Sequence, residues 1–303
     1  MRLFLGIDGG QSGTTAVIGD EAGRVLGEGQ AGPCNHVGAS ERRAKFFSAV
    51  GESVQRAARA AGVEPVFTAV CAGFSGGAAD KDALTRELIR AEHYYITHDA
   101  EIALCGATAG GPGIIVIAGT GSIAYGRDSQ GRTARAGGWG YIYGDEGGAF
   151  DIARQAIRAA LRQEEGWGPP TLLRDSLLQA SGCASANELL HQCYTDAYPR
   201  ERVAQFASLV DEAAMQGDAV ASVLLDHAGQ ELAGIGSAVR RALFEAAQKV
   251  SVHPIGGTWN SQRLHARFQL LMELDGATTV APPRHGPAYG ALLEAIRRTD
   301  ESS

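Results

Sequence analysis

The sequence predicts an α/β protein built from two related halves, each with a mostly parallel sheet covered by helices. Strands and helices alternate along most of the chain, a pattern typical of such sheets. The order strand, glycine turn, meander, helix, strand occurs twice, first near residues 1–100 and again from about residue 101. Each repeat contains an apolar strand that ends in a turn rich in glycine and threonine. Ligands of parallel sheets bind beyond the carboxyl ends of the strands, where both turns lie.

The first half opens with a short apolar strand, expected over residues 2–7, and an antiparallel meander over 16–28. A helix is expected over 41–61, because apolar residues recur there at helical spacing and Gly62 ends the pattern. The remaining elements of this half are a strand, a helix and a strand, over 66–72, 82–91 and 94–97 respectively.

The second half repeats this order and then becomes helical. A helix over 101–109 leads to a strand over 113–118, which ends in the second glycine turn and a second meander over 123–136. The elements expected after the meander are helices 148–163, 171–180, 201–216 and 218–248, strand 250–255, helix 260–274, strand 278–281 and a closing helix to about Arg298.

Composition and charge exclude several classes of protein. The 303 residues are 45% hydrophobic and 20% charged, as in an ordinary soluble enzyme. A net charge of -7 without a long basic run argues against a nucleic-acid partner. The five cysteines form no C-x-x-C pair and no zinc-type spacing, so reduced thiols are expected.

Membrane and secretion signals are also missing from the sequence pattern. No apolar stretch reaches the ~18 residues that a membrane span needs. The N-terminus enters its first strand without the basic region of a signal peptide. We therefore expect a cytoplasmic protein with no membrane partner.

Both glycine turns have the composition of phosphate-binding loops. The first is D-G-G-Q-S-G-T at 8–14, and the second is A-G-T-G-S at 118–122. Glycine allows close approach to a phosphate, consecutive N–H groups form an anion nest, and hydroxyls add donors. Neither turn matches the P-loop motif. Alone, the first could be an ordinary hairpin turn, but two such turns can hold one nucleotide from both sides, which indicates phosphoryl transfer.

Two aspartates follow strands close to these turns. Asp8 is expected to hold Mg²⁺, usually through water, although capping of the turn is the alternative. Asp99 follows His98 at the start of a helix, where it could orient and deprotonate an acceptor hydroxyl or act as the helix N-cap. His98 is expected to pack or to support Asp99 rather than to catalyse.

The densest polar and aromatic loop spans residues 137–148. Trp139, between two glycines, could lie against a sugar ring or could be a core residue in a tight turn. Asp145 or Glu146 could accept hydrogen bonds from hydroxyls, and Glu146 could instead favour the N-terminus of the next helix. Asn35 could reach a ligand, or form an Asx-turn.

The order of these motifs resembles the N-acetylglucosamine kinases of the BadF/BadG-type ATPase family, in the actin-like sugar-kinase superfamily. The chain is also similar to the archaeal broad-specificity hexokinases of that family. The motifs that carry the resemblance are D-G-G-x-x-G-T (8–14), N-H (35–36), S-G-G (75–77), D-A (99–100), G-T-G-S (119–122), G-G-W-G-x-x-x-G-D-E-G (137–147), G-G-T-W (256–259) and G-P-A-Y-G (286–290). They cover nearly the whole chain.

The resemblance implies two ribonuclease-H-like (actin-like ATPase) domains flanking a cleft. Residues 1–100 with 286–303 would carry the first phosphate loop, the sugar site and a returning C-terminal helix, and residues 101–285 would bind ATP. The implied reaction is ATP-dependent phosphorylation of the 6-hydroxyl of an amino sugar, with Asp99 as general base. N-acetylglucosamine is the favoured substrate. A homodimer is usual for such kinases.

The resemblance also assigns individual site residues, with ATP and Mg²⁺ as cofactors and a small-molecule sugar as partner. Those expected to bind the sugar are Asn35, Thr120, Gly138, Trp139, Gly140 and Asp145. Those expected to bind ATP are Gly10, Thr14, Thr120, Gly121, Gly256 and Gly257, with Asp8 at the metal.

Two departures from the family and three alternatives remain. Gly148 replaces a frequent serine, and the first turn is one residue longer than usual, which leaves the roles of Gln11 and Ser12 open. A broader hexose, glucosamine or N-acetylmuramate kinase would keep the same fold. An activator ATPase of an acyl-CoA dehydratase would need cysteines paired for an iron–sulfur cluster. A sugar-sensing regulator would need a helix-turn-helix ahead of the first strand.

Overall fold

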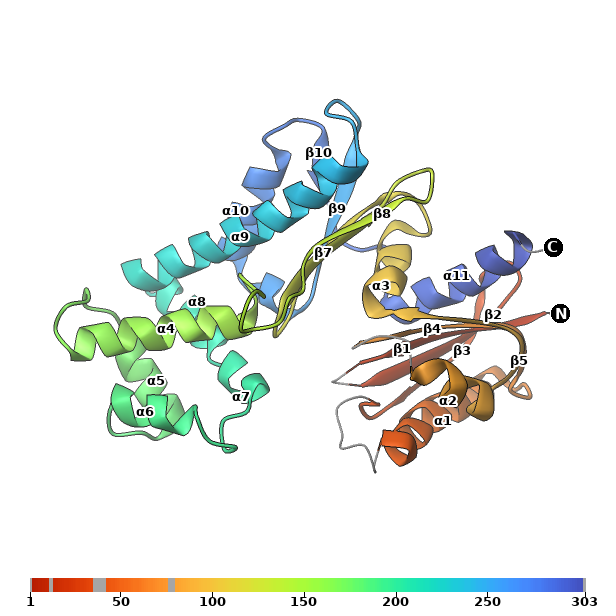
Figure 1. The fold of residues 1–303 in the computed structure, drawn as a ribbon, viewed down its shortest axis with the longest axis horizontal. Coiled ribbons are helices and arrows are strands. Elements are labelled where there is room, and N and C mark those ends of the chain that lie inside the picture. Colours follow the sequence, from red (N-terminus) through yellow and green to blue (C-terminus); the bar gives the residue numbers. More distant parts are fainter. Residues whose placement is uncertain (1, 11–12, 35–41, 76–79, 302–303) are drawn as a thin grey trace. The chain divides into compact units, whose positions relative to one another are not determined.

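A computed structural model describes residues 2–10, 13–34, 42–75 and 80–301, which form two compact α/β units. Unit 1 consists of residues 1–112 and 282–303, and unit 2 of residues 113–281. Each unit is built around a five-stranded mixed sheet (Figure 1). The expected α/β fold with two related sheets is confirmed, but the sheets are mixed rather than mostly parallel, because the meander in each contributes two antiparallel pairings. The domain boundaries expected after residues 100 and 285 stay predictions.

The sheet of unit 1 has the strand order β3-β2-β1-β4-β5. The strands are β1 (Leu3–Gly9), β2 (Thr14–Asp20), β3 (Val25–Ala31), β4 (Val66–Phe74) and β5 (Arg90–His98). The first three form the expected antiparallel meander, and β4 and β5 add in parallel to β1. The turn between β2 and β3 closes because Asp20 Oδ1 accepts the N–H groups of Ala22 and Arg24, while Gly23 takes a positive φ.

Helices cover both faces of this sheet. They are α1 (Arg42–Ala61), α2 (Lys81–Leu88), α3 (Asp99–Thr108) and α11 (Pro287–Glu301). One core cluster joins α1 to alternate residues of β1 and β2, such as Leu5 and Ile18. A second cluster on the opposite face joins Phe4 and Val17 to residues of α3 and α11. Because β1 has apolar side chains on both faces, it is the buried centre of unit 1.

Glycines set the close packing of α11 in unit 1. A Cβ atom added at Gly290 would lie 2.0 Å from the Ile102 carbonyl oxygen of α3. One added at Gly6 of β1 would lie 2.2 Å from the carbonyl oxygen of Ala288. The C-terminal helix therefore packs on the backbone of unit 1.

The sheet of unit 2 repeats the topology of unit 1, with the order β10-β9-β6-β7-β8. The strands are β6 (Gly113–Ala118), β7 (Ser122–Arg127), β8 (Thr133–Gly137), β9 (Val250–Ile255) and β10 (Thr278–Val280). The strands β6, β7 and β8 again form an antiparallel meander, and β9 and β10 again add in parallel. The internal duplication expected from the sequence is therefore confirmed.

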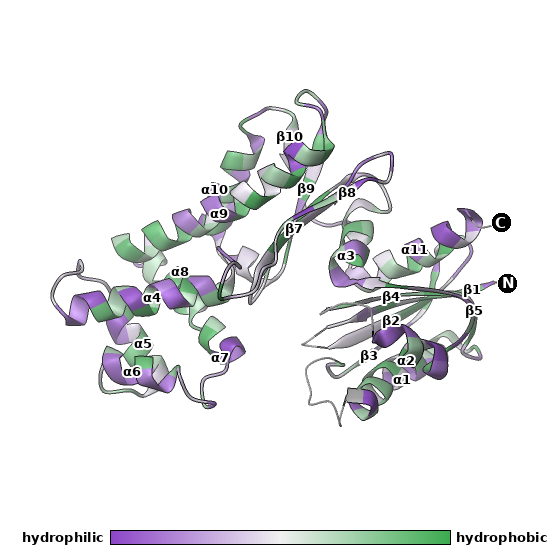
Figure 2. Cartoon of the chain, in the orientation of Figure 1, coloured by the Kyte–Doolittle hydropathy of each residue, from purple (hydrophilic) through white to green (hydrophobic). Residues whose placement is uncertain are grey.

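Unit 2 differs from unit 1 in the segment between its third and fourth strands. Where unit 1 has α1, unit 2 carries a run of helices that pack with its sheet into one core cluster. The run comprises α4 (Ala149–Glu164), α5 (Leu173–Ser181), α6 (Ala186–Gln192), α7 (Arg200–Ala204), α8 (Ala207–Met215) and α9 (Ala219–Leu243). A short 3-10 helix, η1 (Gly257–Asn260), and α10 (Gln262–Glu273) follow β9. Both α1 and α4 carry apolar and polar residues, as amphipathic helices do (Figure 2).

Two expected helices end earlier in the structure than their apolar pattern indicated. The helix expected through residue 91 ends at Leu88, because Arg90 and Ala91 pair in parallel with β4. The helix expected through 248 ends at Leu243. There the buried guanidinium of Arg240 donates to the carbonyl groups of Phe244, Glu245, Ala246 and Gln248 and so fixes a non-helical segment.

Two further differences concern the helices of unit 2. The helix expected over 201–216 is divided, because the N–H groups of Phe206 and Leu209 bond three residues back rather than four. Helix α6 was not expected, although Ser185 caps it by accepting the N–H of Glu188, a recognisable capping pattern. Among the described helices, none combines the length and apolar character that a membrane span requires.

Candidate active site

Two carboxylates lie at the carboxyl edge of the unit 1 sheet. Asp8 is near the end of β1, and Asp99 directly follows β5 as the first residue of α3. Burial, together with the negative charge of Asp99, raises the pKa of Asp8 to about 6. The two groups are therefore close enough for the charge of one to act on the other, because the strands that carry them end at the same edge of the sheet.

The start of α3 leaves the Asp99 carboxylate available. His98 is the N-cap residue, and its Nδ1 accepts the N–H of Glu101 at 3.3 Å. Glu101 accepts the Thr97 hydroxyl and forms an ion pair with Arg298 of α11. Within the described residues, Asp99 accepts one hydrogen bond, from the Ala100 N–H at 2.9 Å. The cap that was the alternative role of Asp99 is thus supplied by His98.

The first glycine turn is tightly packed where it is described. Gly10 N–H donates to the Gly13 carbonyl at 2.9 Å, and a Cβ at Gly9 would lie 2.3 Å from the Phe74 ring. Thr14 is buried, and its hydroxyl donates to the Gly32 carbonyl at 2.9 Å. That hydroxyl is used inside unit 1, so a role for Thr14 in ATP binding stays a prediction. Gln11, Ser12 and Asn35 lie outside the described residues.

The second glycine turn is fixed by the N-terminus of α4. The Gly119 and Thr120 carbonyls accept the N–H groups of Ala149 and Phe150 at 2.8 and 3.1 Å. A Cβ at Gly148 would lie 2.8 Å from the Gly121 carbonyl carbon. The close approach of these two glycines gives a physical reason for glycine, rather than the frequent serine, at position 148 of this chain.

The residues expected to bind ATP in unit 2 lie together. Gly256 has φ +115°, and a Cβ there would lie 2.3 Å from the Ala118 carbonyl oxygen. The Thr258 hydroxyl donates to the Gly119 carbonyl at 3.2 Å, which joins the two turns. The backbones at Thr120, Gly121, Gly256 and Gly257 therefore meet at one end of the sheet, where a nucleotide would need them.

The loop that follows β8 exposes its aromatic residues. Gly138 N–H donates to the Ser122 carbonyl at 2.9 Å, and Gly144 N–H to the Gly140 carbonyl at 2.8 Å. Trp139 is 66% exposed, with the guanidinium of Arg135 4.9 Å from its ring centroid. Trp139 is therefore not a core residue, which was one of its two expected roles. Its contact with a sugar stays a prediction.

Asp145 is held in an unusual backbone conformation at the end of this loop. It is buried, has φ +63°, and forms an ion pair with Arg200 at the start of α7. A Cβ at Gly121 would lie 2.4 Å from Asp145 Oδ2, so this carboxylate touches the second glycine turn. Sequence reasoning did not single out Arg200, because no motif marks the helical segment that contains it.

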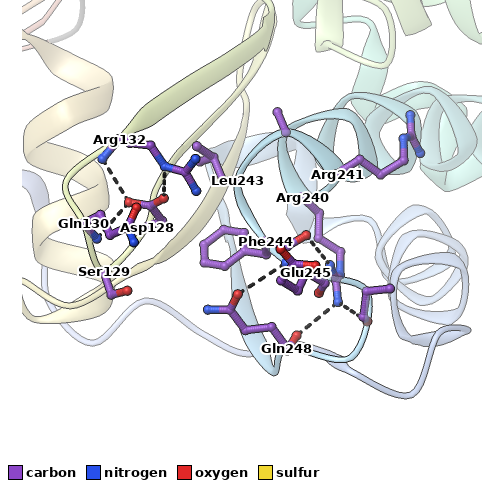
Figure 3. Close-up of a pocket in the computed structure, with 12 residues that line it drawn as sticks. Asp128, Ser129, Gln130, Arg132, Arg240, Arg241, Leu243, Phe244, Glu245 and Gln248 are labelled. Carbon is purple, nitrogen blue, oxygen red and sulfur yellow. Dashed lines mark hydrogen bonds and ion pairs between the residues drawn. The ribbon is translucent and has the colours of Figure 1, made fainter.

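A cavity of about 640 Å³ lies at the other end of unit 2. It is lined by the turn between β7 and β8 and by the segment after α9 (Figure 3). Its polar groups bond to each other: Asp128 accepts Arg132, and Arg240 binds the surrounding carbonyls. It lies at the opposite end of the unit 2 sheet from the second glycine turn and includes none of the candidate site residues of that unit.

The fold and the candidate site define a class of protein with two related α/β units, each of which has a glycine-rich turn with the composition of a phosphate-binding loop. Residues 5–295 match the model of the BadF/BadG/BcrA/BcrD ATPase family, which spans most of the chain. The chain belongs to this family. The resemblance found from the motifs is thereby confirmed.

Individual relatives narrow the comparison. The chain is 32% identical to an N-acetylmuramic acid/N-acetylglucosamine kinase of Clostridium acetobutylicum, over 99% of this chain and 100% of that protein. It is 30% identical to an N-acetyl-D-glucosamine kinase of Dictyostelium discoideum, over 97% and 98% of the two chains. A crystal structure from Chromobacterium violaceum, of a protein assigned to the N-acetylglucosamine kinases, matches with a TM-score of 0.77 and 26% identity, over 98% of this chain and 99% of that one.

Proposed function

We propose that this chain is an ATP-dependent kinase that phosphorylates the 6-hydroxyl of N-acetylglucosamine. The observation that carries the proposal is the placement of Asp99 at the carboxyl edge of the unit 1 sheet, beside Asp8 and with its carboxylate free of the helix cap. Family membership and the two kinases that are 32% and 30% identical to this chain support the choice of an amino sugar.

Asp99 acts as the general base in this proposal. The 6-hydroxyl oxygen attacks the γ-phosphorus of ATP, its proton passes to Asp99, and the bond from the γ-phosphorus to the bridging oxygen breaks to release ADP. Because phosphoryl transfer depends mainly on positioning and charge, the base contributes only part of the rate, typically ~10²–10⁴-fold.

Mg²⁺ would be held beside Asp8, through water and the nucleotide's phosphates, where it would neutralise phosphate charge. One observation fits this ion. The raised pKa of Asp8 marks a buried carboxylate whose charge the described residues leave uncompensated, and Mg²⁺ in proteins is typically held by only one or two carboxylates.

The binding residues in this proposal are those expected from the sequence. The sugar would contact Asn35, Thr120, Gly138, Trp139, Gly140 and Asp145. ATP would contact Gly10, Thr14, Thr120, Gly121, Gly256 and Gly257, mostly through backbone N–H groups. We further propose a cytoplasmic homodimer, with domains 1–100 plus 286–303 and 101–285, on the strength of the resemblance to the family.

N-acetylmuramate is a second candidate substrate. The observation that favours it is the relative from Clostridium acetobutylicum, whose name includes both sugars. An activator ATPase has no such support, because four of the five cysteines are buried inside the two units. Cysteines that share a cluster between subunits would have to reach the surface.

The test is an ADP-release assay on glucose, glucosamine, N-acetylglucosamine, N-acetylmannosamine and N-acetylmuramate, followed by Asp99→Asn. We expect this variant to bind ATP and sugar almost normally, measured by calorimetry, while kcat falls at least ~10²-fold. Asp82→Asn, which changes an exposed carboxylate on α2, is the matched control and should keep full turnover. Near-normal turnover in Asp99→Asn would remove Asp99 from the mechanism.

A further inference from the structure

We propose that Arg200 recognises a carboxylate carried by the sugar and so determines whether this kinase accepts acidic amino sugars. The inference deepens the proposed function and rests on it. It concerns a residue of the helical run of unit 2, which stands where the described part of unit 1 has the single helix α1. The probe that matches this chemistry is N-acetylmuramate, an amino sugar with a carboxylate on its O3 substituent.

Arg200 reaches the loop that is proposed to bind the sugar. Its Nη2 forms the ion pair with Asp145 Oδ2. Its Cζ lies 5.3 Å from the ring centroid of Tyr141 in the same loop and 5.8 Å from that of Phe150. A Cβ at Gly121 would lie only 2.8 Å from Nη2. The guanidinium therefore lies where the sugar loop meets the second glycine turn.

Only one of the two nitrogens on the Nε/Nη2 edge of the Arg200 guanidinium, Nη2, has a carboxylate partner. Its Nε is buried and has no hydrogen-bond partner among the described residues. Arg263 shows the complete arrangement in this same chain, since its Nε and Nη2 bind the two oxygens of Asp226 at 2.9 and 2.6 Å. A side-on pair of this kind is the strong, geometrically specific way in which arginine binds a carboxylate.

An oxygen of a bound carboxylate would complete the edge of Arg200. Its Nε–H is a charged donor, for which a carboxylate oxygen is a stronger acceptor than a neutral hydroxyl. The Asp145 carboxylate would then remain for the sugar hydroxyls, with its charge balanced by Arg200. Arg200 would then bridge two carboxylates, Asp145 through Nη2 and the ligand through Nε.

Two other arginines with a buried, unpartnered Nε lack this position. Arg154 pairs with Asp151 of its own helix and donates to the Tyr141 carbonyl. Arg267 packs over Gly229 on α9. Neither has its carboxylate partner in the sugar loop. Arg154 still supports that loop from beside Arg200, which makes it the matched control.

The experiment measures kcat/KM of the full chain for three sugars: N-acetylglucosamine, N-acetylmuramate and the methyl ester of N-acetylmuramate. The ester has nearly the size of the acid and no charge. For the wild type we expect the acid to exceed the ester at least ~10-fold. Arg200→Gln should remove most of that ratio, and Arg200→Lys should reduce it partly, because lysine keeps the charge without the fork. Arg154→Gln should lower all three values together.

Each other outcome overturns the inference. If Arg200→Gln lowers the three values by the same factor, or raises the KM for ATP with every sugar, Arg200 only holds Asp145 or acts on phosphate. A wild type that phosphorylates N-acetylglucosamine and rejects N-acetylmuramate also overturns it and leaves the proposed function intact. A wild type that phosphorylates none of the sugars would instead overturn the proposed function. If Arg200→Gln fails to fold, the acid-to-ester ratios of the wild type and Arg200→Lys decide.

Discussion

The two units share one strand order but differ in how the carboxylates close to their glycine turns are paired. In unit 2, Asp145 and Asp151 pair with arginines, and Asp218 accepts hydrogen bonds from two backbone N–H groups and a hydroxyl. In unit 1, no ion pair between described residues includes Asp8 or Asp99, and they act on each other as like charges. The comparison sets Asp8 and Asp99 apart: the other carboxylates named here hold loops or helices, as Asp20 and Glu101 do in unit 1, whereas these two form no such pair within the described residues.

The units also differ in how their sheets are covered. Unit 1 has a separate core cluster on each face of its sheet, and the second cluster depends on α11. In unit 2, the helical run, α10 and the sheet form one large cluster. The helix that follows β10, the last strand of unit 2, therefore stabilises unit 1. Three predictions, given by decreasing effect, test these contrasts.

The largest effect is expected from Gly290→Ala, which should lower the free energy of unfolding by about 3 kcal/mol. Its Cβ would lie 2.0 Å from the Ile102 carbonyl oxygen and 2.3 Å from the Gly106 nitrogen, and backbone atoms cannot move aside cheaply. Gly286→Ala is the control, because nothing lies within 4 Å of its Cβ. Hydrogen exchange should rise in β1 and α3 rather than in β6 and β9. Equal rises in both units would contradict the assignment of α11 to unit 1.

Next, Asp8→Asn should stabilise the metal-free protein at pH 8 by about 2–3 kcal/mol. The pKa of Asp8 is about 6 in the folded chain against an ordinary 3.8, so the folded state holds this proton more tightly. The wild type therefore loses stability as the pH rises from about 4 to about 6, and the variant lacks this loss. Urea unfolding with EDTA at pH 4 and pH 8 measures it. A difference between the two proteins that does not change with pH would be inconsistent with the raised pKa.

The smallest effect, of opposite sign, is expected from Asp218→Asn, which should destabilise the chain by about 1–2 kcal/mol at pH 7. Burial acts to raise the pKa of Asp218, but bonds from the Ala221 and Leu172 N–H groups and the Thr171 hydroxyl outweigh it and lower that pKa. The carboxylate therefore contributes stability above about pH 4, which is lost as the pH falls through its folded pKa. Urea unfolding of both proteins at pH 7 and at pH 2.5, well below the ordinary aspartate pKa of 3.8, checks this. A cost that persists unchanged at the lower pH would show that the charge is not involved.

Most of the fold was predictable because its signals are local. The apolar strands, the two meanders and the glycine turns each lie within a few residues of sequence. The misplaced ends depend on distant partners. Arg90 joins β5 because β4 lies beside it, and α9 ends at Leu243 because Arg240 reaches forward to four carbonyls. Local propensity cannot report such contacts.

The candidate site divides in the same way. Asp8, Asp99 and the glycine turns follow strands, so their positions could be predicted from the ends of those strands. Arg200 lies 55 residues after its partner Asp145, in a helix that no motif marks. The exposure of Trp139 and the use of the Thr14 hydroxyl inside unit 1 also depend on tertiary packing.

The packing of α11 also sets an order for folding during synthesis. Residues 287–301 are synthesised after the whole of unit 2, yet they cover Phe4 and Val17 of the first two strands. Until then one face of the unit 1 sheet is covered by α3 alone, although domains usually fold as units from the N-terminus onward. Unit 2 can therefore complete its own core before unit 1 has received α11. The nascent chain therefore exposes this apolar face of unit 1 while unit 2 is being synthesised. Chaperone binding should be strongest during that period.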